Sequence, residues 1–220
     1  MNIFDILGPV MVGPSSSHTA GAARIGYVSR KLLGDTPVFA EILLHGSFAD
    51  TGIGHGTDKA LVAGLLGMQP DNLDIPKSFE IAKEKGMEFK IGKIQLEDVH
   101  PNSVQLNLKS KSGRELKIQA SSLGGGRICI NRIDDIETNF TGEYPTLIVH
   151  NLDQPGHVAE VTSMLAHKSV NIATLNLYRN KKGGYAVMII ETDQEIPADS
   201  IKWLSKVEGV IKVTYLNVRE

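Results

Sequence analysis

Residues 13–26 read Gly13-Pro14-Ser15-Ser16-Ser17-His18-Thr19-Ala20-Gly21-Ala22-Ala23-Arg24-Ile25-Gly26. Glycine and proline interrupt regular structure, and the small and apolar residues after the polar run favour a helix. The pattern therefore predicts a loop that leads into the N-terminus of a helix. Free backbone N–H groups and the positive end of the helix dipole lie at such a terminus, and the hydroxyls and imidazole beside it favour the binding of an anion.

A structural explanation of this stretch is a simple helix cap, for which Ser17 or Thr19 alone would be enough. Five consecutive hydrogen-bonding side chains exceed that requirement, so a functional site is favoured. A nucleotide phosphate is disfavoured because the Gly-Lys-Ser/Thr ending of a P-loop is absent. A small carboxylate is the better expectation. The residues predicted to hold it are Ser15, Ser16, Ser17, His18 and Thr19.

A second polar stretch runs from His45 to Asp58, directly after residues 38–44, which have the pattern of a mostly buried strand. Its glycines allow the backbone to approach a ligand closely. Thr57 or Asp58 is predicted to cap the helix that follows. Two histidines in a glycine-rich connector can also be incidental, and for either histidine alone that interpretation is favoured.

A third polar stretch follows a predicted hairpin, in which residues 104–108 and 116–120 alternate as strands around a turn at 111–113. The hairpin leads to Gly124, Gly125 and Gly126. Consecutive N–H groups of such glycines can form a nest for a carboxylate, although a wide turn explains the pattern equally well.

These stretches resemble the β chain or β domain of the iron–sulfur-dependent L-serine dehydratases. The resemblance rests on Gly-Pro-Ser-Ser-Ser-His-Thr at 13–19, Gly-His-Gly-Thr-Asp at 54–58, His-Pro-Asn at 100–102 and Ser-x-Gly-Gly-Gly at 122–126. The resemblance favours a functional role for the two histidines, which neither histidine indicates on its own. On this likeness we expect His55 to be the catalytic base, supported by His45 and Asp58. The serine run and the three glycines would hold the substrate carboxylate.

The reaction implied by the resemblance is conversion of L-serine to pyruvate and ammonia by β-elimination, without pyridoxal phosphate. A [4Fe-4S] cluster would act as Lewis acid on the leaving hydroxyl. Such a cluster takes about three or four thiolate ligands, whereas this chain has 1 Cys, in an apolar run at Cys129. We therefore expect the cluster on a partner α chain, and no metal ligands in this chain.

Composition changes at residues 134–145, which are acidic, polar and end in proline, and we interpret them as a linker. Beyond it the pattern predicts βαββαβ, the ferredoxin-like order. With the turn Asp153-Gln154-Pro155-Gly156, this part resembles an ACT domain, an amino-acid-responsive module. The expected fold class is α+β: a serine dehydratase β-type domain at 1–140, followed by an ACT domain at 146–220.

The overall composition is that of an ordinary globular protein, with 23 basic and 25 acidic residues among 220 and a net charge of -2. No nucleic-acid partner is expected. No apolar run approaches the roughly 20 residues that span a bilayer, and the acid in Met1–Asp5 does not fit a signal peptide, so we expect a cytoplasmic protein without a membrane partner. Unpaired edge strands predict a homodimer through the ACT domain.

Two other functions remain open at this stage. The chain is also similar to the allosteric substrate-binding and ACT region of some 3-phosphoglycerate dehydrogenases, a likeness that implies a regulatory amino-acid-binding protein without catalysis. A purely structural assembly module is the third option. The dense polar motifs argue against the regulatory function, and stabilisation by serine would exclude the structural option.

Overall fold

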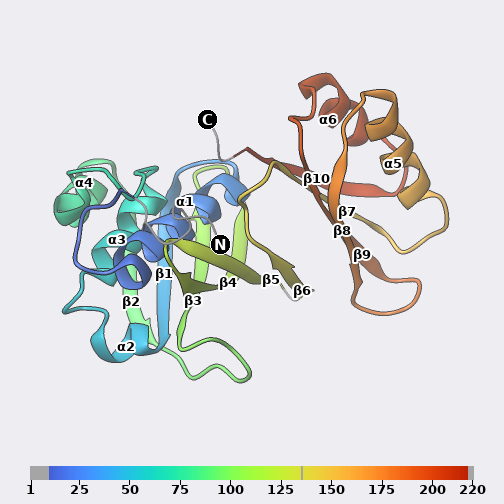
Figure 1. Ribbon diagram of the computed structural model, residues 1–220. Coiled ribbons are helices and arrows are strands. Elements are labelled where there is room, and N and C mark those ends of the chain that lie inside the picture. Colours follow the sequence, from blue (N-terminus) through green and yellow to red (C-terminus); the bar gives the residue numbers. More distant parts are fainter. Residues whose placement is uncertain (1–9, 135, 218–220) are drawn as a thin grey trace. The chain divides into compact units, whose positions relative to one another are not determined.

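The computed structural model describes residues 10–134 and 136–217 of the chain (Figure 1). Met1–Asp5, on which the expected location depends in part, lies outside these ranges. Contacts divide the chain into two compact units, Met1–Asp134 and Asp135–Glu220. The first unit contains all of the polar motifs quoted for the site, and the second contains the βαββαβ pattern.

The first unit is built on a sheet in the strand order β2-β1-β3-β4-β5. Strand β2 runs parallel to β1, and the other neighbours are antiparallel. The predicted strand and hairpin are confirmed, with Leu106 opposite Ile118 in the β3–β4 pair. The strands are β1 (Pro37–Gly46), β2 (Glu88–Lys93), β3 (Asn102–Ser110), β4 (Glu115–Gly124) and β5 (Arg127–Ile133).

Helices cover this sheet because alternate strand residues present an apolar face to them. Helix α1 packs on β3 and β4, and α3 packs on α1 (Figure 1). Ile25 of α1, Leu61 of α3 and Ile118 of β4 are all fully buried in the resulting core. The helices are η2 (Ser16–Gly21), α1 (Ala22–Leu33), α2 (Ser47–Thr51), α3 (Thr57–Leu65), η3 (Ile75–Lys77) and α4 (Ser78–Glu84).

The serine run differs from its prediction as a loop, since Ser16–Gly21 is itself a turn of π-helix, η2. Ser15 is its N-cap, and the backbone N–H groups of Thr19 and Ala20 both approach the Ser15 carbonyl oxygen, at 2.9 and 3.4 Å. Ser15 is the cap because its side chain, rather than that of Ser17 or Thr19, accepts a hydrogen bond from the backbone N–H of His18. Short π-helical turns occur frequently at functional sites.

The side-chain cap predicted for α3, from Thr57 or Asp58, is also wrong. The N-cap is Gly56, whose φ of 70° suits glycine, and no side chain caps the helix. The hydroxyl of Thr57 is buried, and Asp58 Oδ1 instead accepts from the backbone N–H of Lys59 at 2.8 Å. The backbone turn therefore replaces a side-chain cap.

The second unit has a four-stranded antiparallel sheet in the order β10-β7-β9-β8, which confirms the ferredoxin-like arrangement and the α+β class. Helices α5 and α6 cover one face, where Leu147, Met188 and Leu204 belong to one buried cluster. The elements are β6 (Ile136–Phe140), β7 (Thr146–Leu152), α5 (His157–His167), β8 (Ile172–Arg179), β9 (Tyr185–Thr192), α6 (Ala198–Leu204) and β10 (Val210–Leu216). Strand β6 lies inside the predicted linker and contacts β8 and β9.

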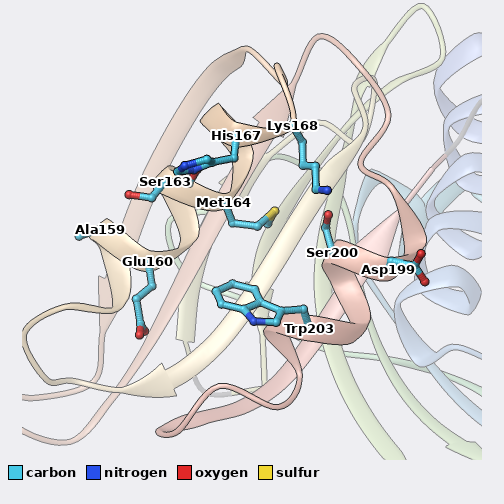
Figure 2. A pocket seen from close by; sticks show the side chains of 9 residues that line it. All are labelled: Ala159, Glu160, Ser163, Met164, His167, Lys168, Asp199, Ser200 and Trp203. Carbon is cyan, nitrogen blue, oxygen red and sulfur yellow. The ribbon is translucent and has the colours of Figure 1, made fainter.

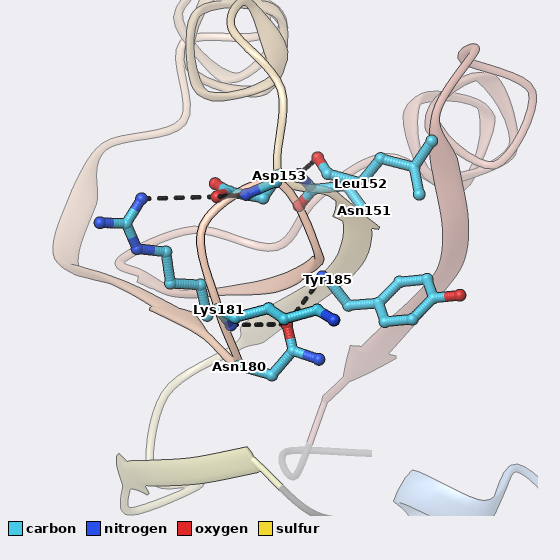
Figure 3. A network of polar contacts seen from close by, with 8 residues as sticks. Asn151, Leu152, Asp153, Asn180, Lys181 and Tyr185 are labelled. Carbon is cyan, nitrogen blue, oxygen red and sulfur yellow. Dashed lines mark hydrogen bonds and ion pairs between the residues drawn. The ribbon is translucent and has the colours of Figure 1, made fainter.

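The turn between β7 and α5 is fixed by polar contacts to the loop between β8 and β9 (Figure 3). Asp153 Oδ2 accepts from the backbone N–H of Gly183 at 2.8 Å and lies 3.4 Å from Arg179 Nη1. In the same loop, Asn180 Oδ1 accepts from the N–H of Tyr185 at 2.9 Å. The turn with the Asp-x-Pro-Gly motif is therefore an ordered part of the unit.

Candidate active site

The imidazole of His18 lies at the start of the π-helix and is surrounded by hydroxyl groups. Its Nε2 is 3.1 Å from Ser47 Oγ and 3.1 Å from Thr51 Oγ1, both on α2. Its Nδ1 is 3.4 Å from Ser15 Oγ, which also accepts from the His18 backbone N–H at 3.1 Å. The Phe48 ring packs against it in an edge-to-face arrangement, with 5.4 Å between ring centroids. His18 is thus held by both polar and aromatic contacts.

His55 is the second imidazole of the site, and its ring centroid is 5.0 Å from that of His18. The side chain is exposed, and its Nδ1 lies 3.0 Å from the Thr51 carbonyl oxygen. A carbonyl oxygen only accepts hydrogen bonds, so Nδ1 carries the proton. Nε2 of the neutral ring then carries a lone pair, and no partner for it is found within 10–134 or 136–217. An exposed imidazole in this state can accept a proton.

Burial lowers the pKa of His18 below its ordinary value of 6.5. The nearby His55 lowers the His18 pKa further, because two imidazolium charges repel, whereas the contact with Ser47 raises it. The lowering of the pKa by desolvation and repulsion exceeds the rise due to Ser47. His18 is consequently held neutral at pH values where a free histidine would already be partly charged.

The three polar stretches singled out in the sequence are brought together in part. Ser16 Oγ accepts from the backbone N–H of Gly125 at 3.3 Å, which joins the serine run to the glycine turn. A Cβ placed on Gly124 would lie 3.5 Å from Ser17 Oγ. Thr19 is buried, with 3% exposure, and its hydroxyl donates to the His55 carbonyl oxygen at 3.2 Å. The first stretch therefore contacts both of the others.

The glycine turn connects β4 with β5. Gly124, Gly125 and Gly126 all have positive φ, at 91°, 62° and 76°. Residues with a Cβ rarely adopt such angles, so three in succession favour glycine. In this conformation the Gly125 N–H points toward the serine run rather than into solvent.

His45 and Asp58 lie at the ends of the elements that flank His55. His45, 8% exposed near the end of β1, accepts at Nδ1 from the backbone N–H of Leu96 at 3.2 Å. Asp58 lies in the first turn of α3. Within the described ranges, neither side chain shows a hydrogen bond to His18 or His55. His45 thus contacts the backbone at Leu96, and Asp58 contacts the first turn of its own helix.

Ser47, Phe48 and Thr51 are not among the predicted site residues, because the glycines of residues 45–58 predict no helix before the one that starts near Thr57. The structure forms the short helix α2 there, with fully buried Phe48 as its anchor. The sequence signal for this helix is the spacing of the Ser47 and Thr51 hydroxyls, since residues four apart lie on the same face of a helix.

A separate pocket of about 680 Å³ lies between α5 and α6 in the second unit (Figure 2). Met164 and Trp203 form apolar parts of its wall, and Glu160, Lys168 and Asp199 surround them. None of the site residues predicted from the sequence lines it. It is distinct from the histidine site of the first unit.

No group of three or more His, Cys, Asp or Glu side chains in 10–134 and 136–217 has an arrangement that could hold a metal ion. In the same ranges no helix is both long and apolar enough to cross a membrane.

Comparison with known proteins relates this site to a family. A family model described as "Serine dehydratase beta chain" matches residues 2–91. The chain is 40% identical over 213 residues to "Probable L-serine dehydratase, beta chain" of Bacillus subtilis (strain 168), covering 97% of this chain and 96% of that protein. It is 41% identical over 212 residues to "L-serine dehydratase, beta chain" of Peptoniphilus asaccharolyticus, covering 96% and 94%.

Similarity at this level over nearly the whole of both proteins defines the class, a lyase subunit of the serine dehydratase type. The chain belongs to the L-serine dehydratase beta chain family. A more distant relative is "D-3-phosphoglycerate dehydrogenase" of Archaeoglobus fulgidus, 22% identical over 200 residues, covering 90% of this chain and 37% of that protein. Among solved structures, the ACT domain of a GTP pyrophosphokinase from Chlorobium tepidum is 24% identical with a TM-score of 0.26, covering 33% and 95%.

Proposed function

We propose that the chain takes part in the conversion of L-serine to pyruvate and ammonia, together with an α chain that carries a [4Fe-4S] cluster. The observation that supports this most directly is the pair of imidazoles, His18 and His55, 5.0 Å apart beside the serine run. β-Elimination from serine needs a group that holds the carboxylate and a base that removes the Cα proton. This site contains groups suited to both tasks.

The carboxylate would be bound by the serine run and the glycine turn. Ser15, Ser16, Ser17, His18 and Thr19 offer hydroxyl, imidazole and backbone donors, and Gly124–Gly126 offer further N–H groups. The contact between Ser16 Oγ and the Gly125 N–H brings the two sets of donors within reach of one small anion. Binding at this position would displace that contact in favour of charge-assisted hydrogen bonds.

His55 is our proposed base. Its Nδ1 proton is directed to the Thr51 carbonyl, so the exposed Nε2 has the lone pair that accepts the Cα proton of serine. The β-hydroxyl then leaves and, with the proton released again by His55, becomes water, which leaves aminoacrylate. Aminoacrylate tautomerises to the imine, and water hydrolyses the imine to pyruvate and ammonia. His45 and Asp58 would support His55 by fixing the backbone on either side of it.

The cluster is assigned to the α chain because the donor set of this chain does not fit it. Cys129 is buried, and the described residues contain no suitable group of ligands around it. We therefore derive no step through the cluster from the residues of this chain. Activity on L-serine is proposed to require both chains.

The second unit is proposed to act as an ACT domain that regulates the enzyme or joins two copies of the chain, with the domains divided near residues 140–146. Strand β8 is at one edge of its sheet, and Leu175 and Leu177 on it are exposed. An edge strand of this kind offers backbone N–H and C=O groups for pairing with a second copy. A cytoplasmic location, and the absence of nucleic-acid and membrane partners, stay predictions.

The alternative of a non-catalytic amino-acid-binding protein is less well supported. The dehydratase β chains match nearly the full chain at 40% and 41% identity, against 22% for the phosphoglycerate dehydrogenase. An exposed imidazole with an oriented lone pair is also more than binding requires. A purely structural module would leave the whole polar site unexplained.

The test is anaerobic affinity purification of the chain from its own host, with assays for iron, acid-labile sulfide and serine-dependent pyruvate. We expect a cysteine-containing partner to co-elute with iron and activity. In the assembled enzyme, His55→Ala should lower turnover by about 10²–10⁴-fold, whereas His167→Ala, on the exposed face of α5, should not. Near-full turnover of His55→Ala would exclude it as the base, and a metal-free, inactive chain stabilised by an amino acid would favour the regulatory alternative.

A further inference from the structure

Thr51 is the last residue of the short helix α2, and it contacts both histidines of the site. Its Oγ1 is 3.1 Å from His18 Nε2, and its carbonyl oxygen is 3.0 Å from His55 Nδ1. The helix that carries it is anchored by Phe48, which is fully buried. The backbone N–H of Ser47 donates to the Pro101 carbonyl oxygen at 2.9 Å. Thr51 is therefore presented to both rings from a fixed element.

Counting protons determines the direction of the hydrogen bond to His18. The Thr51 hydroxyl has one proton, which it donates to the Ser47 carbonyl oxygen at 2.9 Å. With that bond made, only its lone pairs remain for His18, so His18 Nε2 donates to Thr51 Oγ1. Ser47 Oγ, 3.1 Å from the same nitrogen, is a second acceptor beside it. Nδ1 of neutral His18 then carries the lone pair and faces Ser15 Oγ, at 3.4 Å.

The two rings consequently differ in which nitrogen carries the proton. His18 is protonated at Nε2 through the Thr51 hydroxyl, and His55 is protonated at Nδ1 through the Thr51 carbonyl. We propose that Thr51 is a positioning residue that holds His18 and His55 in these opposite tautomers, through its hydroxyl and its carbonyl respectively. Thr51 thereby keeps the Nε2 lone pair of His55 available as base and gives His18 one fixed orientation beside it. This catalytic consequence rests on the proposed dehydratase function.

The chain offers a matched control in the second unit. Thr162 of α5 donates its hydroxyl to the Val158 carbonyl oxygen, four residues earlier, at 2.8 Å. This is the same intrahelical bond that Thr51 makes with Ser47. Replacing either threonine with valine removes one such bond and keeps the β-branched shape, but only Thr51→Val affects a histidine.

The test uses the full chain with 15N-labelled histidine, because long-range 1H–15N correlation spectra distinguish the two tautomers of each ring. In the wild type we expect His18 protonated at Nε2 and His55 protonated at Nδ1. Thr51→Val should abolish the preference of His18 and leave His55 unchanged, since the carbonyl remains. Thr51→Ser should restore the wild-type pattern, and Thr162→Val should retain it. A wild-type His18 protonated at Nδ1, or an unchanged His18 in Thr51→Val, would overturn the proposal.

A kinetic measurement on the enzyme assembled with its α chain tests the catalytic consequence. Thr51→Val should lower kcat by about tenfold and shift the pH profile of kcat/KM, and Thr51→Ser should restore both. An unchanged pH profile despite a lost tautomer preference would exclude the catalytic consequence. If the wild type itself forms no pyruvate, the dehydratase function fails, whereas the spectra still decide the role of Thr51.

Discussion

Gly26 of α1 and Gly64 of α3 lie directly against each other where the two helices cross. A Cβ on Gly26 would overlap the Leu61 carbonyl oxygen, and a Cβ on Gly64 would overlap the Ala23 carbonyl oxygen. The two backbones are therefore closer than any larger residue permits. Because α1 follows the serine run and α3 follows His55, this contact sets the separation of the two halves of the candidate site.

Gly64→Ala should destabilise the protein by about 1–3 kcal/mol or more, because the added methyl group must push two rigid backbones apart. Chemical denaturation measures the free energy of unfolding directly. The matched control is Gly54→Ala, where the added Cβ would meet the Thr51 carbonyl oxygen at an ordinary 3.5 Å. Equal stability of the two variants would show that the helices are not in close contact.

Two adjacent serines of β4 should respond differently to replacement by alanine. Ser121 Oγ donates to Asn131 Oδ1 at 2.6 Å and lies 2.7 Å from Ser103 Oγ. Ser122 Oγ is equally buried, but no partner for it is found within the described ranges. Ser121→Ala should cost about 0.5–1.5 kcal/mol because it removes the hydrogen bond to half-buried Asn131, whereas Ser122→Ala should be neutral or stabilising.

Denaturation of both serine variants under the same conditions supplies the comparison. The two side chains have the same size and nearly the same burial, so loss of packing contributes equally to each. A cost for Ser122→Ala equal to that of Ser121→Ala would indicate a hydrogen bond or a bound water at Ser122.

Hydrophobic periodicity was sufficient to predict β1, the β3–β4 hairpin and the second unit, because each buries one face of an alternating or helical pattern. It failed at the site for a physical reason. At Ser16–Gly21 and Ser47–Thr51 the helical turns are determined by contacts with distant residues, such as those of His18 with Ser47 and of Ser16 with Gly125. Strand β6 was missed because its composition is that of a linker, and its pairing depends on tertiary context.

The dimer proposal predicts an effect of charge at the β8 edge. Leu177 is 46% exposed on β8, and Leu177→Lys should weaken self-association by about tenfold or more, since a charged lysine on an edge strand is a common block to edge pairing. The control is Ile211→Lys, at 55% exposure on β10, which is the opposite edge of the sheet. Sedimentation equilibrium measures the dissociation constant. A monomeric wild type would exclude the dimer. An effect of Ile211→Lys alone would show that the dimer interface lies at β10 and not at β8.

The lowered pKa of His18 predicts how stability depends on pH. The folded pKa lies below the ordinary value of 6.5, so between these two values the unfolded chain binds more protons than the folded one. Stability from this group is therefore complete above pH 6.5 and is lost as the pH falls through the window below it. In His18→Gln, the free energy of unfolding should decrease less between pH 7 and pH 5 than in the wild type. Parallel curves for the two proteins would contradict this.

The two causes of the lowered His18 pKa can be separated in a second variant. Burial is the larger cause and repulsion from His55 the smaller. In His55→Gln the repulsion is absent and the burial remains, so the pKa of His18 should rise toward 6.5 without reaching it. NMR titration of the His18 ring measures this directly. A His18 pKa that does not change in His55→Gln would mean that the two rings do not sense each other's charge at a separation of 5.0 Å.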